Sequence, residues 1–381
     1  MTTRRDLLTL GTASLAALGA GLAQAKEDST AKPSTEPAAA GERKVYRVGV
    51  ISPAKHVING HTWHFAQYLH PRCDFDQLKK HYPRGEASFR KYFRNPKTNF
   101  DVLPFADTEI THYFDAADPK VAALFGDAFP GVRVPASLEE MVQEVDAVWL
   151  GDANGLGEDH FDLVAPGLKR GLPTFCDKPI GGTVEGTKKI LDFAREHQAP
   201  LMSGSIFNHE WGMEAAQRMR DSGEFGPIEH VSAQLYSGLG PDGWMVYGQH
   251  PAWSVVRLMG AGVDSVSLYE QNRKTHGLVT YPDRAPCRIW CGQPYEKFEY
   301  HRSEIYFQKK FFSHTPSIEG DYNFGYHYSM FRMAATFREM IRTRVEPIPH
   351  QEILEVTAIV HAGKKSLAEQ SRLVKLAEVL G

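Results

Sequence analysis

The chain has 381 residues, of which 42% are hydrophobic and 23% are charged, and its formal net charge at pH 7 is −3. This length accommodates two domains of roughly 100–200 residues each, with the composition of an ordinary soluble globular protein. The nearly balanced charge gives no basis for a nucleic-acid partner, so none is predicted.

The first 25 residues, MTTRRDLLTLGTASLAALGAGLAQA, combine an arginine pair, an apolar run and a small-x-small end. This pattern is typical of a twin-arginine signal peptide and predicts export, to the periplasm in a bacterium. The alternative is an uncleaved membrane anchor, for which the apolar run is short. Residues 26–42 are polar and rich in Pro and Ala, which predicts a flexible leader, so the folded protein should begin near Arg43.

From residue 43 to about residue 205, short apolar strands alternate with amphipathic helices. The predicted strands are 44–52, 108–115, 146–153, 172–179 and 199–208. The predicted helices are 58–69, 118–129, 137–145, 159–171 and 183–198, and a basic, aromatic insertion covers about residues 72–103. This alternation predicts an α/β fold with a Rossmann-like, doubly wound parallel sheet over 43–205. The insertion is read as a surface elaboration, or alternatively as a lid or subunit contact.

Longer strands with alternating apolar residues follow. A helix is predicted over 210–226, strands over 227–238, 288–292 and 297–313, and a closing helix over 352–370. They predict a C-terminal α+β domain over 206–381 with a mainly antiparallel sheet, one face covered by helices and the other open to a ligand or a second subunit. Cys287 and Cys291 would lie on one face of a strand about 13 Å apart, too far for a disulfide. Cys176 is predicted to be a small buried apolar residue.

Three charged residues stand where predicted parallel strands end: Asp115, Asp152 and Lys178. Open α/β sheets bind ligands outside the carboxyl ends of their strands, so these side chains should meet at one binding edge. The triplet Asp177-Lys178-Pro179 has, by itself, the composition of a simple turn.

The segment from DAVWLGDANGLG to APLMSG, residues 146–204, resembles the core of the glucose-fructose oxidoreductase, inositol dehydrogenase and rhizopine-catabolism (Gfo/Idh/MocA) family, where a Glu-Lys-Pro triplet corresponds to Asp177-Lys178-Pro179. The resemblance implies a Rossmann domain, a tightly held NAD or NADP, a carbohydrate or cyclitol substrate and a homo-oligomer. It also implies that Lys178 lies at the nicotinamide and the substrate hydroxyl, where an ammonium group would stabilise a developing alkoxide.

The family also carries a helical histidine that exchanges protons with the substrate alcohol and follows an aspartate by four residues. The matching stretch, MVYGQHPAWSVVRLMGAG, places His250 at the histidine position and Val246 at the aspartate position. The alternative is a structural histidine in a loop. The resemblance further implies that Asn208, His209 and Tyr247 line the substrate pocket.

The nucleotide loop departs from the family. A dinucleotide site needs glycines for the tight turn and for close approach to the pyrophosphate, whereas VISPAKHVINGH has Ser52-Pro53-Ala54 in place of Gly-x-Gly. Ser52 or Lys55 would then contact phosphate. Asp115 is placed for a ribose hydroxyl, favouring NAD over NADP, or alternatively caps the next helix. The residues predicted to bind the cofactor are Ser52, Asp115, Asp152, Asp177 and Lys178.

A divalent metal is an alternative cofactor, because imidazole and carboxylate groups gather near the same predicted edge. The candidate ligands are His160, His209, Glu210 and His250, with His61 and His64 opening the first helix. These are donors that Zn²⁺ or Mn²⁺ accepts, although no compact motif such as HExxH is present.

The sequence therefore predicts an exported oxidoreductase that exchanges hydride between bound NAD(P) and a sugar or cyclitol hydroxyl, with Lys178 and His250 at the reacting carbon. One alternative is a metal- or NAD-assisted carbohydrate lyase, hydratase or glycosidase on the same fold, and a second is a non-catalytic sugar-binding protein. No integral membrane partner is predicted.

Overall fold

The computed structural model describes residues 44–53, 60–83, 85–86, 104–153, 155–235, 240–272, 274–292, 301–315 and 322–381. Residues 44–381 form one compact unit. The predicted signal peptide and leader, Lys55, and residues 87–103 of the predicted insertion lie outside the described residues. No helix in the described ranges has the length and apolarity needed to cross a bilayer.

The first sheet has five parallel strands in the order β2-β1-β3-β4-β5, which confirms the predicted Rossmann-like fold. The strands are β1 Tyr46–Ser52, β2 Thr108–Asp115, β3 Ala147–Leu150, β4 Thr174–Cys176 and β5 Leu201–Met202. The strand predicted over 199–208 is wrong beyond Met202. The Ser205 hydroxyl accepts the Phe207 N–H (3.2 Å) and caps a 3₁₀ helix, η1 Ile206–His209, because a short polar residue offers the backbone this local bond.

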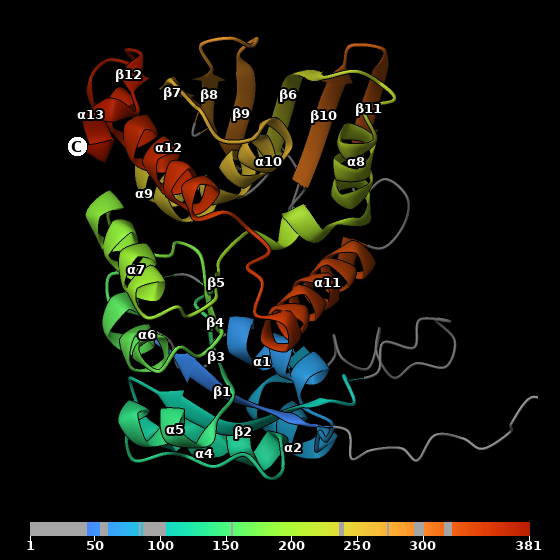
Figure 1. Cartoon of the computed structure of the whole chain (residues 1–381), viewed down its shortest axis with the longest axis vertical. Coiled ribbons are helices and arrows are strands. Elements are labelled where there is room, and N and C mark those ends of the chain that lie inside the picture. Colours follow the sequence, from blue (N-terminus) through green and yellow to red (C-terminus); the bar gives the residue numbers. More distant parts are fainter. Residues whose placement is uncertain are drawn as a thin grey trace, which may run out of the picture. The chain divides into compact units, whose positions relative to one another are not determined.

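Helices cover both faces of this sheet (Figure 1). One face carries α5 Leu138–Glu144, α6 His160–Lys169 and α7 Val184–Glu196, and the other carries α1 Gly60–Leu69, α4 Pro119–Ala128 and α11 Tyr322–Thr343. Alternate strand residues supply the two cores: Val148 and Leu150 pack into the first, Ala147 and Trp149 into the second. This alternation is what a doubly wound sheet requires, since neighbouring side chains of a strand point to opposite faces.

Helix α11 belongs to the C-terminal half of the chain but packs on the N-terminal sheet. The Trp149 ring stacks on Phe175 (centroids 3.8 Å apart) and meets Phe337 of α11 edge-on (5.1 Å). The predicted insertion contains α2 Phe75–His81, which begins with Asp74 accepting the backbone N–H groups of Asp76 and Gln77.

The second sheet has seven strands in the order β11-β10-β6-β9-β8-β7-β12. They are β6 Ile228–Leu235, β7 Ser265–Gln271, β8 Lys274–Thr280, β9 Cys287–Gly292, β10 His301–Phe307, β11 Lys310–His314 and β12 Val374–Lys375. Only the β6–β9 pair among these described strands is parallel, as the prediction of a mainly antiparallel sheet requires. The remaining helices are α8 Trp211–Ser222, α9 Gly240–Tyr247, α10 Gln249–Met259, α12 His350–Ala368 and α13 Ala377–Leu380.

The two faces of this second sheet differ. Val231, Ile289 and Ile305 are buried in the core that α10 and α12 share, whereas Tyr306 and Phe311, paired on the opposite face, remain 41% and 53% exposed. Cys287 and Cys291 are unbridged and buried.

Candidate functional site

Lys178 lies two residues beyond β4, at the carboxyl edge of the parallel sheet, as predicted. The residue is 3% exposed, its Nζ donates to the Ala153 carbonyl (3.4 Å), and it lies 6.0 Å from the ring centroid of Tyr247. Burial lowers the pKa of Lys178, and the nearby Asp177 and Asp152 carboxylates oppose that shift. A buried lysine with a lowered pKa exchanges protons more readily than a solvated one and is typical of functional sites.

Asp177 organises the backbone around this lysine. Its Oδ1 accepts the Lys178 N–H (2.7 Å), while its Oδ2 accepts the Asp152 N–H (2.8 Å) and lies 2.5 Å from His61 Nδ1. His61, the second residue of α1, is 15% exposed at its side chain. The structure therefore builds a histidine–carboxylate pair beside Lys178 from residues 116 positions apart. From the sequence, His61 was predicted near this edge only as a possible metal ligand.

Asp152 faces a different histidine. Its Oδ2 lies 3.2 Å from His160 Nε2, and His160 Nδ1 lies 3.6 Å from the Cys176 sulfur. Burial opposes charge on both members, but the nearby Cys176 and Asp152 raise the pKa of His160 to about 10, and the His160 hydrogen bond lowers the pKa of Asp152 to about 2. His160 is 0% exposed, so this buried pair fixes the start of α6 to the sheet edge.

His250 is the second residue of α10, so the alternative of a loop histidine is wrong. Its Nδ1 lies 2.7 Å from the Ser205 hydroxyl, and the Phe207 ring meets it edge-on at 4.8 Å. Burial, with the positive charge of Lys178 next in effect, lowers the pKa of His250 well below its ordinary value. His250 is thus a neutral imidazole near Lys178, paired with a hydroxyl instead of a carboxylate.

Glu210 contacts two histidines that sequence analysis missed. Its Oε2 lies 2.8 Å from His301 Nδ1 and 3.2 Å from His314 Nε2, and all three side chains are at most 2% exposed. The ligands proposed for a metal are consequently separated: His160 faces Asp152, Glu210 faces His301 and His314, and His250 faces Ser205. Within the described ranges, no group of three or more His, Cys, Asp or Glu residues has the geometry of a metal site. The spacing of strands and helices in the sequence predicted that these side chains lie together at one edge. In the structure, each of them instead contacts a different neighbour.

Glu210 gives a pH-dependent stability prediction. Burial raises the pKa of Glu210 from 4.5 to about 7, against the opposing effect of His314. Between these values the folded state keeps a proton that the unfolded state releases, so this group's contribution to stability falls as pH rises. Scanning calorimetry measures the Tm of Glu210→Gln and of the unaltered protein. We expect the Tm of the variant, relative to that of the unaltered protein, to increase from pH 5 to pH 7. A difference that does not change with pH would contradict this.

Ser52 and Asp115 end adjacent strands and pair in register. Asp115 Oδ1 accepts the N–H groups of Ala117 and Asp118 (2.9 and 3.0 Å), while Asp118 is the residue that caps α4. Asp115 Oδ2 is buried without a hydrogen-bond partner among the described residues, and burial raises the pKa of the carboxyl. One oxygen thus shapes the turn and the other is left for a ligand, which fits a ribose hydroxyl. The alternative prediction, that Asp115 caps the next helix, is wrong, because Asp118 caps α4.

Of the predicted substrate residues, Tyr247 lies beside Lys178, while Asn208 and His209 line a cavity between α8, α10 and α11. Arg257 and Arg332, which sequence analysis missed, line the same cavity. The one feature of the sequence that could have pointed to them is an arginine within a largely apolar stretch of each helix, α10 and α11.

Comparisons with known proteins agree with this fold. Residues 87–205 match the family model GFO_IDH_MocA, described as an oxidoreductase family with an NAD-binding Rossmann fold. An uncharacterized oxidoreductase of Streptococcus pneumoniae is 28% identical over 35% of this chain and 34% of its own length. The rhizopine catabolism protein MocA of Rhizobium meliloti is 31% identical over 27% of this chain and 32% of its own. The chain therefore aligns with about a third of each of these curated relatives.

Solved structures extend the likeness of fold to nearly the whole chain. The scyllo-inositol dehydrogenase of Lactobacillus casei, with bound NAD(H) and scyllo-inositol, has a TM-score of 0.67 and 14% identity, covering 88% of this chain and 100% of that one. A putative myo-inositol dehydrogenase of Sinorhizobium meliloti has a TM-score of 0.65 and 16% identity over 87% and 100% of the two chains. These structures show the fold of nearly the whole chain, and the match over residues 87–205 identifies its Rossmann core as that of the Gfo/Idh/MocA oxidoreductase family.

Proposed function

We propose that the chain is an NAD(P)-dependent oxidoreductase that exchanges hydride with a hydroxyl-bearing carbon of a sugar or cyclitol. The observation that carries this proposal is the buried Lys178, with the Asp152 and Asp177 carboxylates near it, at the ligand-binding edge of a Rossmann sheet. The family match and the inositol dehydrogenases among its relatives support the substrate class. Export through the twin-arginine route and assembly as a homo-oligomer are part of the same proposal and rest on the sequence.

Oxidation of an alcohol requires a base for the hydroxyl proton and an acceptor for the hydride. When bound, the nicotinamide supplies the hydride acceptor. Lys178, whose burial strengthens its electrostatic effect, holds the substrate oxygen and stabilises the alkoxide as the proton leaves. The family's usual aspartate partner for His250 is absent, since Val246 stands in its place.

In this proposal His61 takes the proton. Asp177 accepts the hydrogen bond of the Nδ1–H and so fixes the tautomer in which Nε2 is the basic nitrogen. The same carboxylate stabilises the imidazolium that forms, as in other histidine–carboxylate pairs. His250, neutral and held by Ser205, contributes a hydrogen bond to the substrate.

Cofactor binding is tested first, by denaturing release of whatever the purified folded protein carries and mass analysis of the released nucleotide. Near-stoichiometric NAD(H) or NADP(H) is the expected result. The protein carrying no nucleotide and taking none up on addition would overturn the proposal and leave sugar binding without catalysis as the function to test.

Asp115 sets the expected cofactor preference, because its unpaired Oδ2 is placed for a ribose hydroxyl and a carboxylate there disfavours a 2′-phosphate. We expect Asp115→Asn to weaken NAD binding about tenfold relative to NADP, as the loss of one charge-assisted hydrogen bond predicts. Titration of both nucleotides measures this ratio. The amide keeps an oxygen for the turn at Ala117, so the fold should persist; an unchanged ratio would exclude Asp115 from the ribose site.

A lyase or hydratase on the same fold is the second candidate. The absent partner for His250 favours it, as does a 24% identical relative, the 2,7-anhydro-N-acetylneuraminate hydratase of Mediterraneibacter gnavus. Product analysis separates the two: an oxidoreductase leaves a ketone or aldehyde and one reduced nucleotide per turnover, whereas a lyase or hydratase leaves the nucleotide unchanged at the end of each turnover.

A further inference from the structure

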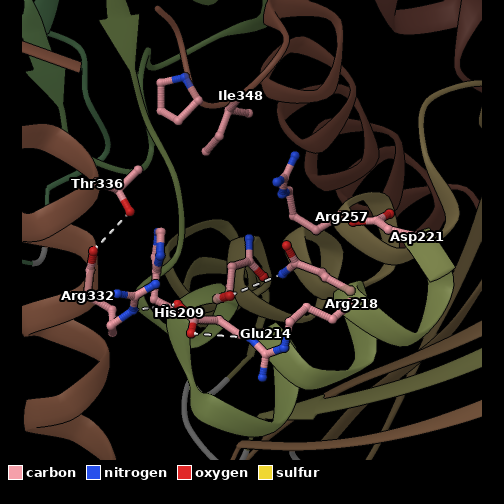
Figure 2. A pocket seen from close by; sticks show the side chains of 11 residues that line it. His209, Glu214, Arg218, Asp221, Arg257, Arg332, Thr336 and Ile348 are labelled. Atoms are coloured by element: carbon pink, nitrogen blue, oxygen red, sulfur yellow. Dashed lines mark hydrogen bonds and ion pairs between the residues drawn. The ribbon is translucent and has the colours of Figure 1, made fainter. Parts of the chain in front are cut away.

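A cavity of about 270 Å³ lies between α8, α10, α11 and the segment at Pro347 and Ile348, and Asn208 and His209 also line it. Figure 2 shows Arg332 of α11 and Arg257 of α10 on opposite sides of it. None of the residues that line it belongs to the network around Lys178 and Asp177. The cavity is smaller than a typical drug-sized ligand site, so it fits a small molecule.

Asn208 lines this cavity with its amide group unused. The residue is 4% exposed, and neither its Nδ2 nor its Oδ1 has a hydrogen-bond partner among the described residues. Its backbone carbonyl, in contrast, accepts a bond from Gln217 (3.2 Å), so the residue is firmly placed. A buried amide without partners costs free energy, and such a group calls for a functional explanation. A ligand that supplies both an acceptor and a donor provides one.

The cationic groups around Asn208 also have donors to spare. Arg332 Nε donates to Glu214 (2.8 Å) and Arg257 Nη1 donates to Glu352 (2.6 Å), so neither ion pair uses the whole five-donor guanidinium. Burial, followed by the positive charges of Arg257 and Arg332, lowers the pKa of His209 to about 3. His209 is therefore a neutral imidazole lying in the positive potential of two arginines.

We propose that this cavity binds a small oxyanion, a carboxylate or phosphate group, through Arg257, Arg332 and the Asn208 amide. Guanidinium groups on two sides suit oxyanions, whose charge-assisted bonds are stronger than neutral ones. Three arginines and two carboxylates, Glu214 and Asp221, line the cavity, so the net charge favours a singly charged ligand with hydroxyl groups over a polyanion. Anion binding here needs no nucleotide and no turnover, so its test is independent of the proposed hydride reaction.

Calorimetric titration of the purified full-length protein tests the proposal with three probes: gluconate, inorganic phosphate and uncharged glucose. We expect gluconate or phosphate to bind and glucose not to bind at this cavity. Binding of gluconate alone would identify a sugar acid as the ligand, and binding of both anions would identify the oxyanion group itself.

Two variants assign the binding to these residues. Asn208→Ala should weaken anion binding about tenfold without lowering Tm, because it removes a buried group that lacks partners. Arg332→Gln should weaken it at least as much, while Arg342→Gln, on the same helix but outside the cavity, should leave it unchanged. Absence of anion binding in the millimolar range would overturn the proposal, as would unaltered anion affinity in Asn208→Ala. Glucose binding that Arg332→Gln weakens as much as anion binding would also overturn it.

Discussion

Replacing Lys178 with methionine should lower kcat about a thousandfold while leaving the fold and the bound nucleotide in place. The side chain is 3% exposed and its ammonium would lie at the developing alkoxide, where one preorganised donor contributes 10²- to 10³-fold or more. Methionine has a similar length and removes only the charge and the donor. Turnover with a panel of cyclitols and sugars, and nucleotide content per chain, measure the two effects separately.

The same variant should change how stability depends on pH. Burial lowers the pKa of Lys178 from 10.5, so between the lowered value and 10.5 the unfolded state binds more protons and stability from this group rises with pH. Lys178→Met should lack that rise and should unfold at a higher temperature than the unaltered protein near neutral pH. Lys178→Arg, which keeps a charge that cannot be lost, is the matched control for stability and should also lack that rise. Normal turnover in Lys178→Met would end the proposed role.

Replacing His61 with asparagine should lower kcat about a hundredfold, which is the effect expected from loss of a general base. Asparagine preserves a polar side chain beside Asp177 but cannot accept a proton at neutral pH. The rate of the variant should depend on hydroxide concentration, because solvent then has to take the proton. Rates across the pH range, with a solvent isotope effect, provide the measurement.

Two control variants test whether the loss of turnover is specific to His61. His64→Asn changes a histidine three positions later on the same helix, whose Nε2 lies 3.1 Å from the Tyr82 hydroxyl, and should leave turnover unchanged. His250→Asn should lower turnover less than His61→Asn does, since a neutral histidine held by Ser205 contributes only a hydrogen bond. The reverse order of effects would return the proton-accepting role to His250.

Residues close in sequence allowed much of the first domain to be predicted. Ser137 caps α5 by accepting the Glu140 N–H (3.1 Å), and the Glu140 carboxylate accepts the Ala136 N–H (2.8 Å), so bonds between neighbours start the helix predicted over 137–145. Gly171 adopts φ +68° just past α6, as the predicted helix end requires. These signals are local because each bond joins residues within one turn.

The same reasoning failed where a neighbour distant in sequence decided the outcome. His301 and His314 were overlooked because nothing near them in the chain suggests a role, yet both reach Glu210 across β10 and β11. Phe337 packs on Trp149 although the two belong to opposite halves of the chain. One failure was local instead: the strand predicted over 199–208 ends at Met202, and the Ser205 hydroxyl then accepts the Phe207 N–H at the start of η1.

By itself, the sequence determined the alternation of strands and helices, the position of Lys178 at the binding edge and the match of the Rossmann core to the Gfo/Idh/MocA family. Periodicity, caps and a contiguous motif all depend on neighbouring residues. Only the tertiary structure decided which histidine meets Asp177 and which groups surround Asn208. The physical reason is that hydrogen bonding, burial and charge depend on the neighbours a side chain acquires on folding, and those neighbours come from distant parts of the chain.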